Sequence, residues 1–163
     1  MSGVRPIICI FPHSARKEPI FRNGPDALRR WLTGELRERE GLYYIRCRES
    51  KPSRRNLPFP LPKHIPAGSI VLFRIKGETI GEALVKEEAR RTTTEERREL
   101  KVKEGYPYEA LIKFDPESVK IYPKPLTDLD LFNMLGNCVP YNMYRVLKPQ
   151  QYKEIMRRIG ALN

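Results

Sequence analysis

The chain has 163 residues, of which 40% are hydrophobic and 31% charged, and a formal net charge of +11. This length fits a single domain with one hydrophobic core, and the composition is typical of a folded, soluble protein. The apolar run at residues 7–11 is too short for a membrane span or a secretion signal, and Pro12, His13 and Arg16 interrupt it. We therefore expect no membrane association and a cytoplasmic location.

The three cysteines Cys9, Cys47 and Cys138 lie far apart in the chain. A disulfide framework or a zinc knuckle requires closely spaced pairs, so the sequence supports neither. We expect reduced cysteines in or near the core, a reducing compartment, and no bound metal or other cofactor.

The positive charge is concentrated in the N-terminal part. Residues 1–64 contain 14 Lys and Arg against 6 acidic residues, whereas residues 65–163 contain 17 against 14. Such asymmetry favours a surface that faces a polyanion. The alternative is a solvated, highly charged surface of a heat-tolerant protein.

The N-terminal elements are a short strand at 7–11, a loop at 12–18 and a helix from Asp26 to Gly41. Four apolar residues recur at helical spacing in that helix, Leu28, Trp31, Leu32 and Leu36. Its outer face carries Arg29, Arg30, Arg37 and Arg39. An alternating strand at 43–48 and a proline-rich loop at 50–66 follow.

The later elements alternate short strands with turns. Residues 70–75 and 79–86 predict a hairpin, and Gly81 predicts a bulge or a close backbone approach. Residues 87–105 form a charged insertion in which Glu95 and Glu96 follow three threonines that can cap a polar helix. We expect a second hairpin from 106–114 and 119–122, turned at 115–118, then a helix at 127–135, a strand at 143–147 and a helix at 149–159. The pattern predicts one α+β domain over residues 1–163, a small and mostly antiparallel β-barrel flanked by helices.

Catalytic motifs are few. The two histidines, His13 and His64, are distant in sequence and accompany no nucleophile or metal motif, and the chain has no phosphate-binding or dinucleotide-binding glycine pattern. Cys47 and His64 can meet in a fold, but any cysteine and histidine can do so. We therefore expect no enzymatic activity from this chain alone.

Nucleic-acid binding is better supported. An aromatic and basic stretch runs from the strand at 43–48 into the proline-rich loop, and consists of Tyr44, Arg46, Arg48, Lys51, Arg54 and Arg55. Arginine forks suit phosphate oxygens and aromatic rings stack on bases. Arg16 and Lys17 of the first loop extend this set of expected phosphate contacts. The alternative is that Tyr44 packs under the helix and the arginines are only solvated.

A second aromatic cluster comprises Tyr106, Tyr108, Tyr141 and Tyr144. Tyrosines at strand ends line pockets, but they also fill the rims of barrels, and both interpretations stay open. Trp31 lies on the apolar stripe of the first helix, which predicts a place in the core and only secondarily in a pocket wall.

Two segments resemble a known family. Residues 65–73 (IPAGSIVLF) followed by 76–83 (KGETIGEA), and later residues 108–125, are similar to EVE- and ASCH-like members of the PUA-like superfamily. The resemblance covers roughly residues 40–160. It implies a barrel whose surface pocket accepts one flipped nucleobase, commonly a modified one.

The resemblance also implies site residues and partners. EVE and YTH relatives are readers of modified bases, and similar domains begin McrB-like modification-dependent restriction proteins. In them the loop after the first strand and the strand-end aromatics form the pocket. Carried over to this chain, the pocket residues are His13, Ser14, Tyr43, Tyr44, Tyr106 and Tyr108. The pocket tryptophans of many relatives have no counterpart, because Trp31 lies on the helix.

Three hypotheses follow. The first is a non-catalytic reader of DNA, probing a modified base by base flipping and targeting a partner nuclease or AAA+ motor. The second is an RNA-binding domain of the same fold. The third is a small ASCH-like hydrolase or nuclease with His13 near its centre.

Overall fold

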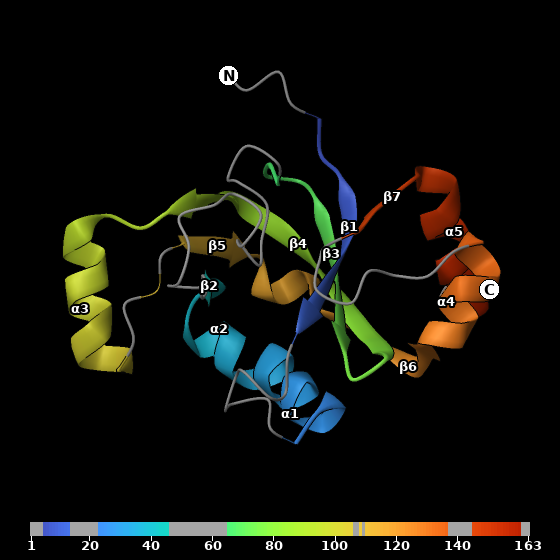
Figure 1. Ribbon diagram of the computed structural model, residues 1–163, viewed down its shortest axis with the longest axis horizontal. Coiled ribbons are helices and arrows are strands. Elements are labelled where there is room, and N and C mark those ends of the chain that lie inside the picture. The colour runs from blue at the N-terminus through green and yellow to red at the C-terminus, as the bar shows by residue number, and fades with distance from the viewer. Residues whose placement is uncertain are drawn as a thin grey trace.

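The computed structural model describes residues 5–13, 23–45, 65–105, 108, 110–136 and 145–160. In chain order the elements are β1 (Ile8–His13), α1 (Pro25–Arg30), the π-helical segment η2 (Trp31–Glu35), α2 (Leu36–Glu38), β2 (Leu42–Ile45), β3 (Ile70–Ile75), β4 (Glu78–Arg91), α3 (Thr94–Glu104), β5 (Ala110–Phe114), the 3₁₀ helix η5 (Pro116–Ser118), β6 (Lys120–Thr127), α4 (Asp128–Leu135), β7 (Arg145–Leu147) and α5 (Pro149–Arg158). The strands belong to one mixed sheet with helices on both faces, and α3 projects from one end (Figure 1).

The first helix forms as the apolar spacing predicts. Leu28, Leu32 and Leu36 are fully buried, and Pro25 occupies the first turn, where its missing N–H costs no hydrogen bond. The helix is not uniform, because its middle, η2, is a π-helical stretch. The helix ends at Glu38, and the turn after it closes at Gly41, whose φ of +88° places it in the left-handed region and whose N–H donates to the Leu36 carbonyl at 2.8 Å.

The predicted hairpin of β3 and β4 is confirmed. The two strands pair antiparallel through Lys76 and Gly77, which both have positive φ, as a tight two-residue hairpin turn requires. β4 is longer than predicted, because residues 87–91 continue the strand. Gly81 makes the expected close approach, since a Cβ there lies 2.6 Å from the Lys120 carbonyl oxygen of β6.

The predicted second hairpin is wrong. β5 and β6 do not pair with each other; both pair with β4, β6 along residues 78–82 and β5 along residues 85–91. The connection is the 3₁₀ turn η5, which Asp115 caps by accepting a hydrogen bond from the Glu117 N–H. Residues 115–118 form a turn, as predicted, but this turn directs the chain around a corner and does not reverse it into a hairpin.

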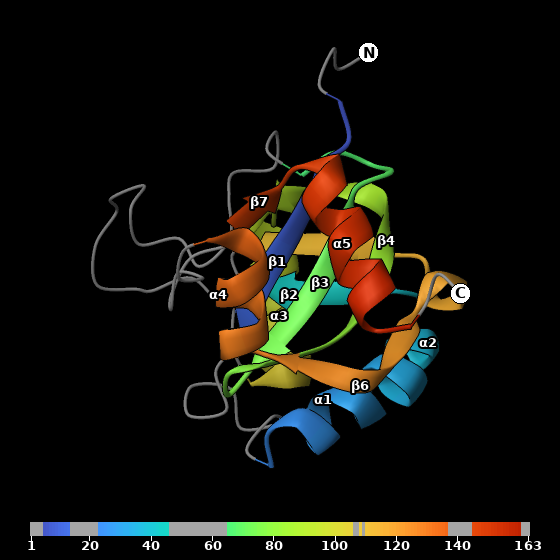
Figure 2. The ribbon, with the colours of Figure 1, turned by 90° about the vertical axis from the view of Figure 1, so that its right-hand side faces the viewer.

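The sheet carries a separate core on each face. Alternation along β1 sends Phe11 to one side and Ile10 to the other, and alternation along β3 does the same with Phe73 and Leu72. The helical segment α1–α2 covers the first face and α4 and α5 cover the second, as Figure 2 shows from the α5 side. Within the described ranges the strand order β2-β5-β4-β3-β1-β7 does not close, so the predicted barrel is open.

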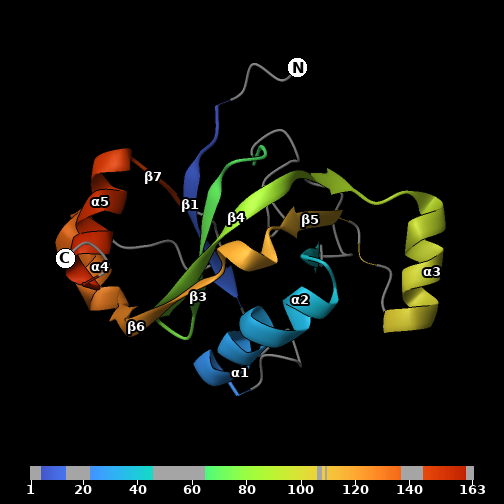
Figure 3. The same cartoon turned by 180° about the vertical axis from the view of Figure 1, so that it is seen from behind.

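The charged insertion is half strand and half helix. Thr93 caps α3 by accepting a hydrogen bond from the Glu96 N–H, and the Glu96 carboxylate accepts one from the Thr93 N–H in return, which confirms the predicted cap. Leu100 is the buried residue of this helix. Figure 3 shows from behind that α3 stands apart from the helices that cover the sheet.

The C-terminal elements match the predicted helices and strand. Tyr152 of α5 donates a hydrogen bond to the buried carboxyl of Glu82 on β4 at 2.6 Å, and Tyr122 of β6 donates a second at 2.9 Å. The Arg74 guanidinium of β3 binds both carboxylate oxygens of Asp128 at the start of α4, at 2.8 and 2.6 Å. These polar links hold both covering helices to the sheet.

Within the described ranges, no helix is both long and apolar enough to cross a membrane.

Gly41→Ala tests the helix end. Alanine at this position has to adopt the left-handed backbone conformation. Its Cβ would also lie 1.9 Å from the Phe114 carbonyl oxygen. We expect a loss of more than about 2 kcal/mol in the free energy of unfolding, measured by urea denaturation. Gly34→Ala is the matched control, because nothing lies within 4 Å of its Cβ. An equal loss in both variants contradicts the backbone explanation.

Tyr152→Phe tests the Glu82 link. Burial, and then the hydrogen bond to Glu82, raise the pKa of Tyr152 above its ordinary value of 10.0. A raised pKa contributes stability that is complete below the unfolded-state value and is lost as the pH rises towards the folded-state value. At pH 8 we expect the variant to have a free energy of unfolding lower than the wild type by about 1–3 kcal/mol. Between about pH 9 and 11 we expect the wild type to lose more stability than the variant, because the variant lacks the tyrosine whose contribution is lost. Parallel profiles of wild type and variant contradict this role.

Candidate nucleic-acid interface

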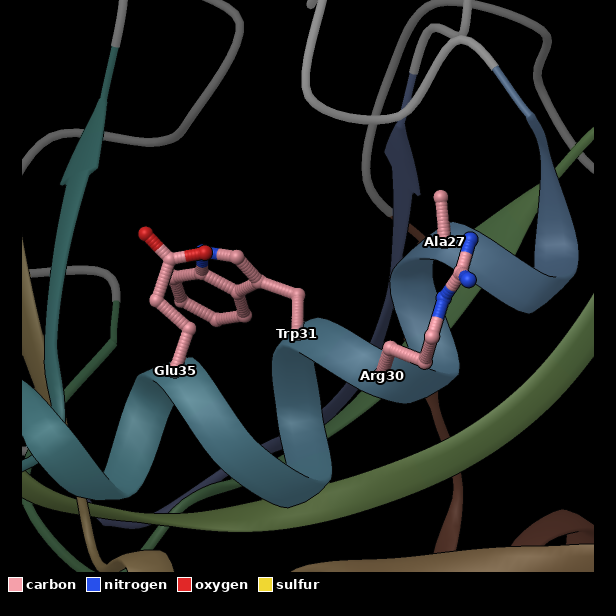
Figure 4. A pocket seen from close by; sticks show the side chains of 4 residues that line it. All are labelled: Ala27, Arg30, Trp31 and Glu35. Atoms are coloured by element: carbon pink, nitrogen blue, oxygen red, sulfur yellow. The ribbon is translucent and has the colours of Figure 1, made fainter.

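A shallow hollow of about 220 Å³ lies along the first helix. Ala27, Arg30, Trp31 and Glu35 line it (Figure 4). Ala27, Trp31 and Glu35 follow one another at intervals of four residues, and side chains at that interval lie on one side of a helix. Trp31 and Glu35 are the first and last residues of η2, so the π-helical stretch spans the hollow. π-Helical stretches are rare in proteins, and those that occur often lie at functional sites.

The indole of Trp31 forms the apolar wall. Its exposed fraction is 6%, and it belongs to the core cluster, as the helical stripe predicts. Tyr43 of β2 packs edge-on against it with ring centroids 5.1 Å apart, and Phe114 packs on Tyr43 at 6.1 Å. This aromatic stack holds the indole in place. Tyr43, predicted to line a base pocket, is itself buried at 4% exposure and lies behind the wall.

The polar walls carry opposite charges. Arg30 is exposed and forms no ion pair with another described residue. The Glu35 carboxylate accepts two hydrogen bonds from Arg39, at 3.0 and 3.2 Å, and Arg39 also binds Glu104 at the end of α3. Burial lowers the pKa of Arg39, but the hydrogen bonds to Glu104 and Glu35 outweigh it, so the net pKa is raised. The hollow thus offers a donor cation and a fixed acceptor beside the indole of Trp31.

Two strands contribute residues to the core beside Trp31. Phe11 of β1 and Tyr43 of β2 share a core cluster with Trp31, and these strands end shortly afterwards, at His13 and Ile45. The backbones of His13 and Tyr44 therefore lie in strands that pack on the hollow's helix, while their side chains lie outside the described residues. The strand predicted at 7–11 extends to His13, so Pro12 and His13 belong to β1 and not to the loop.

Most of the predicted site residues lie outside the described ranges. They are Ser14, Arg16, Lys17, Arg46, Arg48, Lys51, Arg54, Arg55 and Tyr106, together with Tyr141 and Tyr144 of the second aromatic cluster. Tyr108 is half-buried, and its carbonyl accepts a hydrogen bond from the Thr92 hydroxyl at 2.7 Å. The structure does not place Tyr108 among the residues that line the hollow.

The sequence pattern alone does not single out Arg30 or Glu35 as candidate site residues. Arg30 was assigned only to the outer face of the helix, and Glu35 had no role. The available signal was the spacing from Ala27 through Trp31 to Glu35, which places a carboxylate one turn from the only tryptophan of the chain. In the described part of the chain, no group of three or more potential metal ligands occurs.

Comparison by sequence finds no matching family model and no curated relative. Comparison by structure finds the ASCH protein of Zymomonas mobilis, with a TM-score of 0.54 and 10% identity over 92% of this chain and 94% of that one. A hypothetical protein from Leishmania major has a TM-score of 0.55 and 17% identity over 96% of both chains.

A third similar structure is the N-terminal domain of McrB from Thermococcus gammatolerans, solved bound to m5C DNA. Its TM-score is 0.50 and its identity 14%, over 96% of this chain and 99% of that domain. Sequence identities this low establish shared architecture alone. The chain therefore has the PUA-like fold of ASCH domains and of the McrB N-terminal domain.

Proposed function

We propose that this chain is a non-catalytic nucleic-acid-binding module that reads a modified base in DNA. The observation that carries the proposal is the position of the hollow. It lies on a helix that shares one hydrophobic core with β1 and β2, and the sequence continues from these two strands directly into basic segments. Residues 46–64 contain six Lys and Arg and one acid. The DNA-bound McrB domain of the same fold supports the choice of ligand.

The chemistry of the hollow suits one nucleobase. The indole contributes apolar contact, Arg30 donates to ring or carbonyl acceptors, and Glu35 accepts from an exocyclic amino group or a ring N–H. Extruding a base from a duplex costs a few kcal/mol, which contacts to the base and to the flanking phosphates must offset. His13, Ser14, Tyr44 and Tyr106 complete the proposed pocket, with Tyr43 supporting Trp31 from behind.

The basic segments hold the phosphates in this proposal. Arg16, Lys17, Arg46, Arg48, Lys51, Arg54 and Arg55 are the proposed contacts. Contacts of this kind fix the position of the module on the duplex and carry no sequence information, so the base has to be selected in the hollow. A nuclease or AAA+ motor that the module directs to modified DNA is the proposed partner.

The first experiment is a fluorescence-anisotropy titration. The probes are matched duplexes, unmodified or carrying 5-methylcytosine, 5-hydroxymethylcytosine or N6-methyladenine, with single-stranded RNA alongside. Tighter binding to one modified duplex supports the reader function. Preferential RNA binding favours the second hypothesis, and cleavage of any probe that is lost in His13→Ala favours the hydrolase.

Arg54→Ala combined with Arg55→Ala tests the phosphate contacts. Removing two phosphate-binding cations lowers the affinity for every duplex and reduces the slope of log affinity against log salt by about 2. The measurement is the same titration repeated at several salt concentrations. An unchanged slope removes this loop from the interface.

Glu35→Gln tests base selection. The amide keeps the shape of the side chain but replaces one acceptor oxygen by a donor, so we expect a changed preference between modified and unmodified duplexes with a smaller change in overall affinity. Glu38→Gln is the control, because Glu38 is an exposed carboxylate of the same helical segment outside the hollow. Equal effects of the two variants on base preference speak against the hollow as the base site.

A further inference from the structure

We propose that the opposite face of the sheet carries a second surface that binds the phosphodiester backbone of nucleic acid, independently of base identity. This α5–β6 basic face consists of Lys120 and Lys124 of β6 and Lys153, Arg157 and Arg158 of α5. It goes beyond the base-reading hollow, and it rests on the proposed function in taking nucleic acid as the ligand.

The packing of α5 turns its cations outward. Ile155, Met156 and Ile159 are buried in the second core, and Tyr152 reaches inward to the Glu82 carboxyl. Figure 2 shows α5 lying over the sheet, so the side of the helix opposite these residues faces solvent. Lys153, Arg157 and Arg158 lie on it and are exposed. The surface is thus built on an anchored element.

β6 adds its lysines to the same side. Lys120 is the direct partner of Glu82 in the antiparallel pairing of β4 and β6, and paired residues project to the same face of a sheet. Glu82 points to Tyr152 of α5, so Lys120 also lies on the α5 face. Both Lys120 and Lys124 are exposed.

The carboxylate of Asp130 on α4 lies near cations from both α5 and β6. Hydrogen bonds from the Thr127 backbone and hydroxyl, and then the charges of Arg158 and Lys124, lower the pKa of Asp130. One carboxylate is therefore within electrostatic reach of a cation from α5 and of one from β6. Arg158 lies 3.8 Å from this carboxylate, and Arg157 pairs with Glu154.

The charge balance of α5 differs from that of the other described helices. Residues 25–40 contain four Lys and Arg and four acidic residues, and α3 also contains four of each sign. By contrast, α5 contains three Lys and Arg and one acid, Glu154, and the five cations of the α5–β6 basic face have two carboxylates beside them, Glu154 and Asp130. An excess of exposed cations on one anchored face is what a phosphate backbone requires, and contacts to the backbone carry no sequence information.

The test is Lys153→Gln with Arg157→Gln. In anisotropy titrations we expect weaker binding to unmodified and modified duplexes by the same factor, a salt slope lower by about 2, and an unchanged preference between them. The matched control is Arg98→Gln with Lys101→Gln on α3, which removes the same charge from exposed positions of a projecting helix. Glu154→Gln tests the opposite sign and is expected to strengthen binding.

The outcomes separate the two proposals. If the α5 variant keeps the affinity and salt slope of the wild type, and the wild type shows a base preference, the second surface is overturned and the base-reading proposal stands. Equal losses in the α5 and α3 variants also overturn it, because net charge then explains the effect. Absence of nucleic-acid binding by the wild type at low salt overturns both proposals. Thermal unfolding of each variant excludes a folding defect as the cause.

Discussion

The fold depends on the place where β4 changes its partner along one edge. That edge pairs with β6 as far as Glu82 and with β5 from Val85 onward. Between them, the Leu84 N–H donates to the Ser118 hydroxyl and the Leu84 carbonyl accepts from the Asp115 N–H, both at 2.8 Å. This corner lets two consecutive strands share one edge, and the register shifts beside it bend β4 as bulges do.

The two faces of the bent sheet then acquire different surfaces. On one face the helix α1–α2 buries its apolar stripe and leaves a hollow beside Trp31. On the other, α5 buries its apolar side and is fixed by the Tyr152–Glu82 hydrogen bond, so its cations face solvent. The charged arm α3 is connected to the first face, since Arg39 binds both Glu35 of the hollow and Glu104 of α3.

The elements that the sequence predicted correctly are those with local signals. The helical stripe of Leu28, Leu32 and Leu36, the Lys76–Gly77 turn and the threonine cap of α3 each depend on residues close together in the chain. The predicted hairpin of β5 and β6 failed because strand partners are chosen by contacts with β4, which is distant in sequence. For the candidate site, the sequence pointed to the basic segments and to Trp31 as a core residue, but missed Arg30 and Glu35, whose role depends on which helix side stays uncovered.

By itself, the sequence determined the periodicity of each element, the ends set by Gly41 and Gly136, and the concentration of positive charge in its first 64 residues. These follow from backbone conformation and composition, which neighbouring residues control. Only the tertiary structure decided that β5 and β6 share one edge of β4, that Tyr43 packs against Trp31, and that Arg158 of α5 pairs with Asp130 of α4. Such pairings join residues far apart in the chain, and their energy comes from packing and charge across the sheet, which no local pattern encodes.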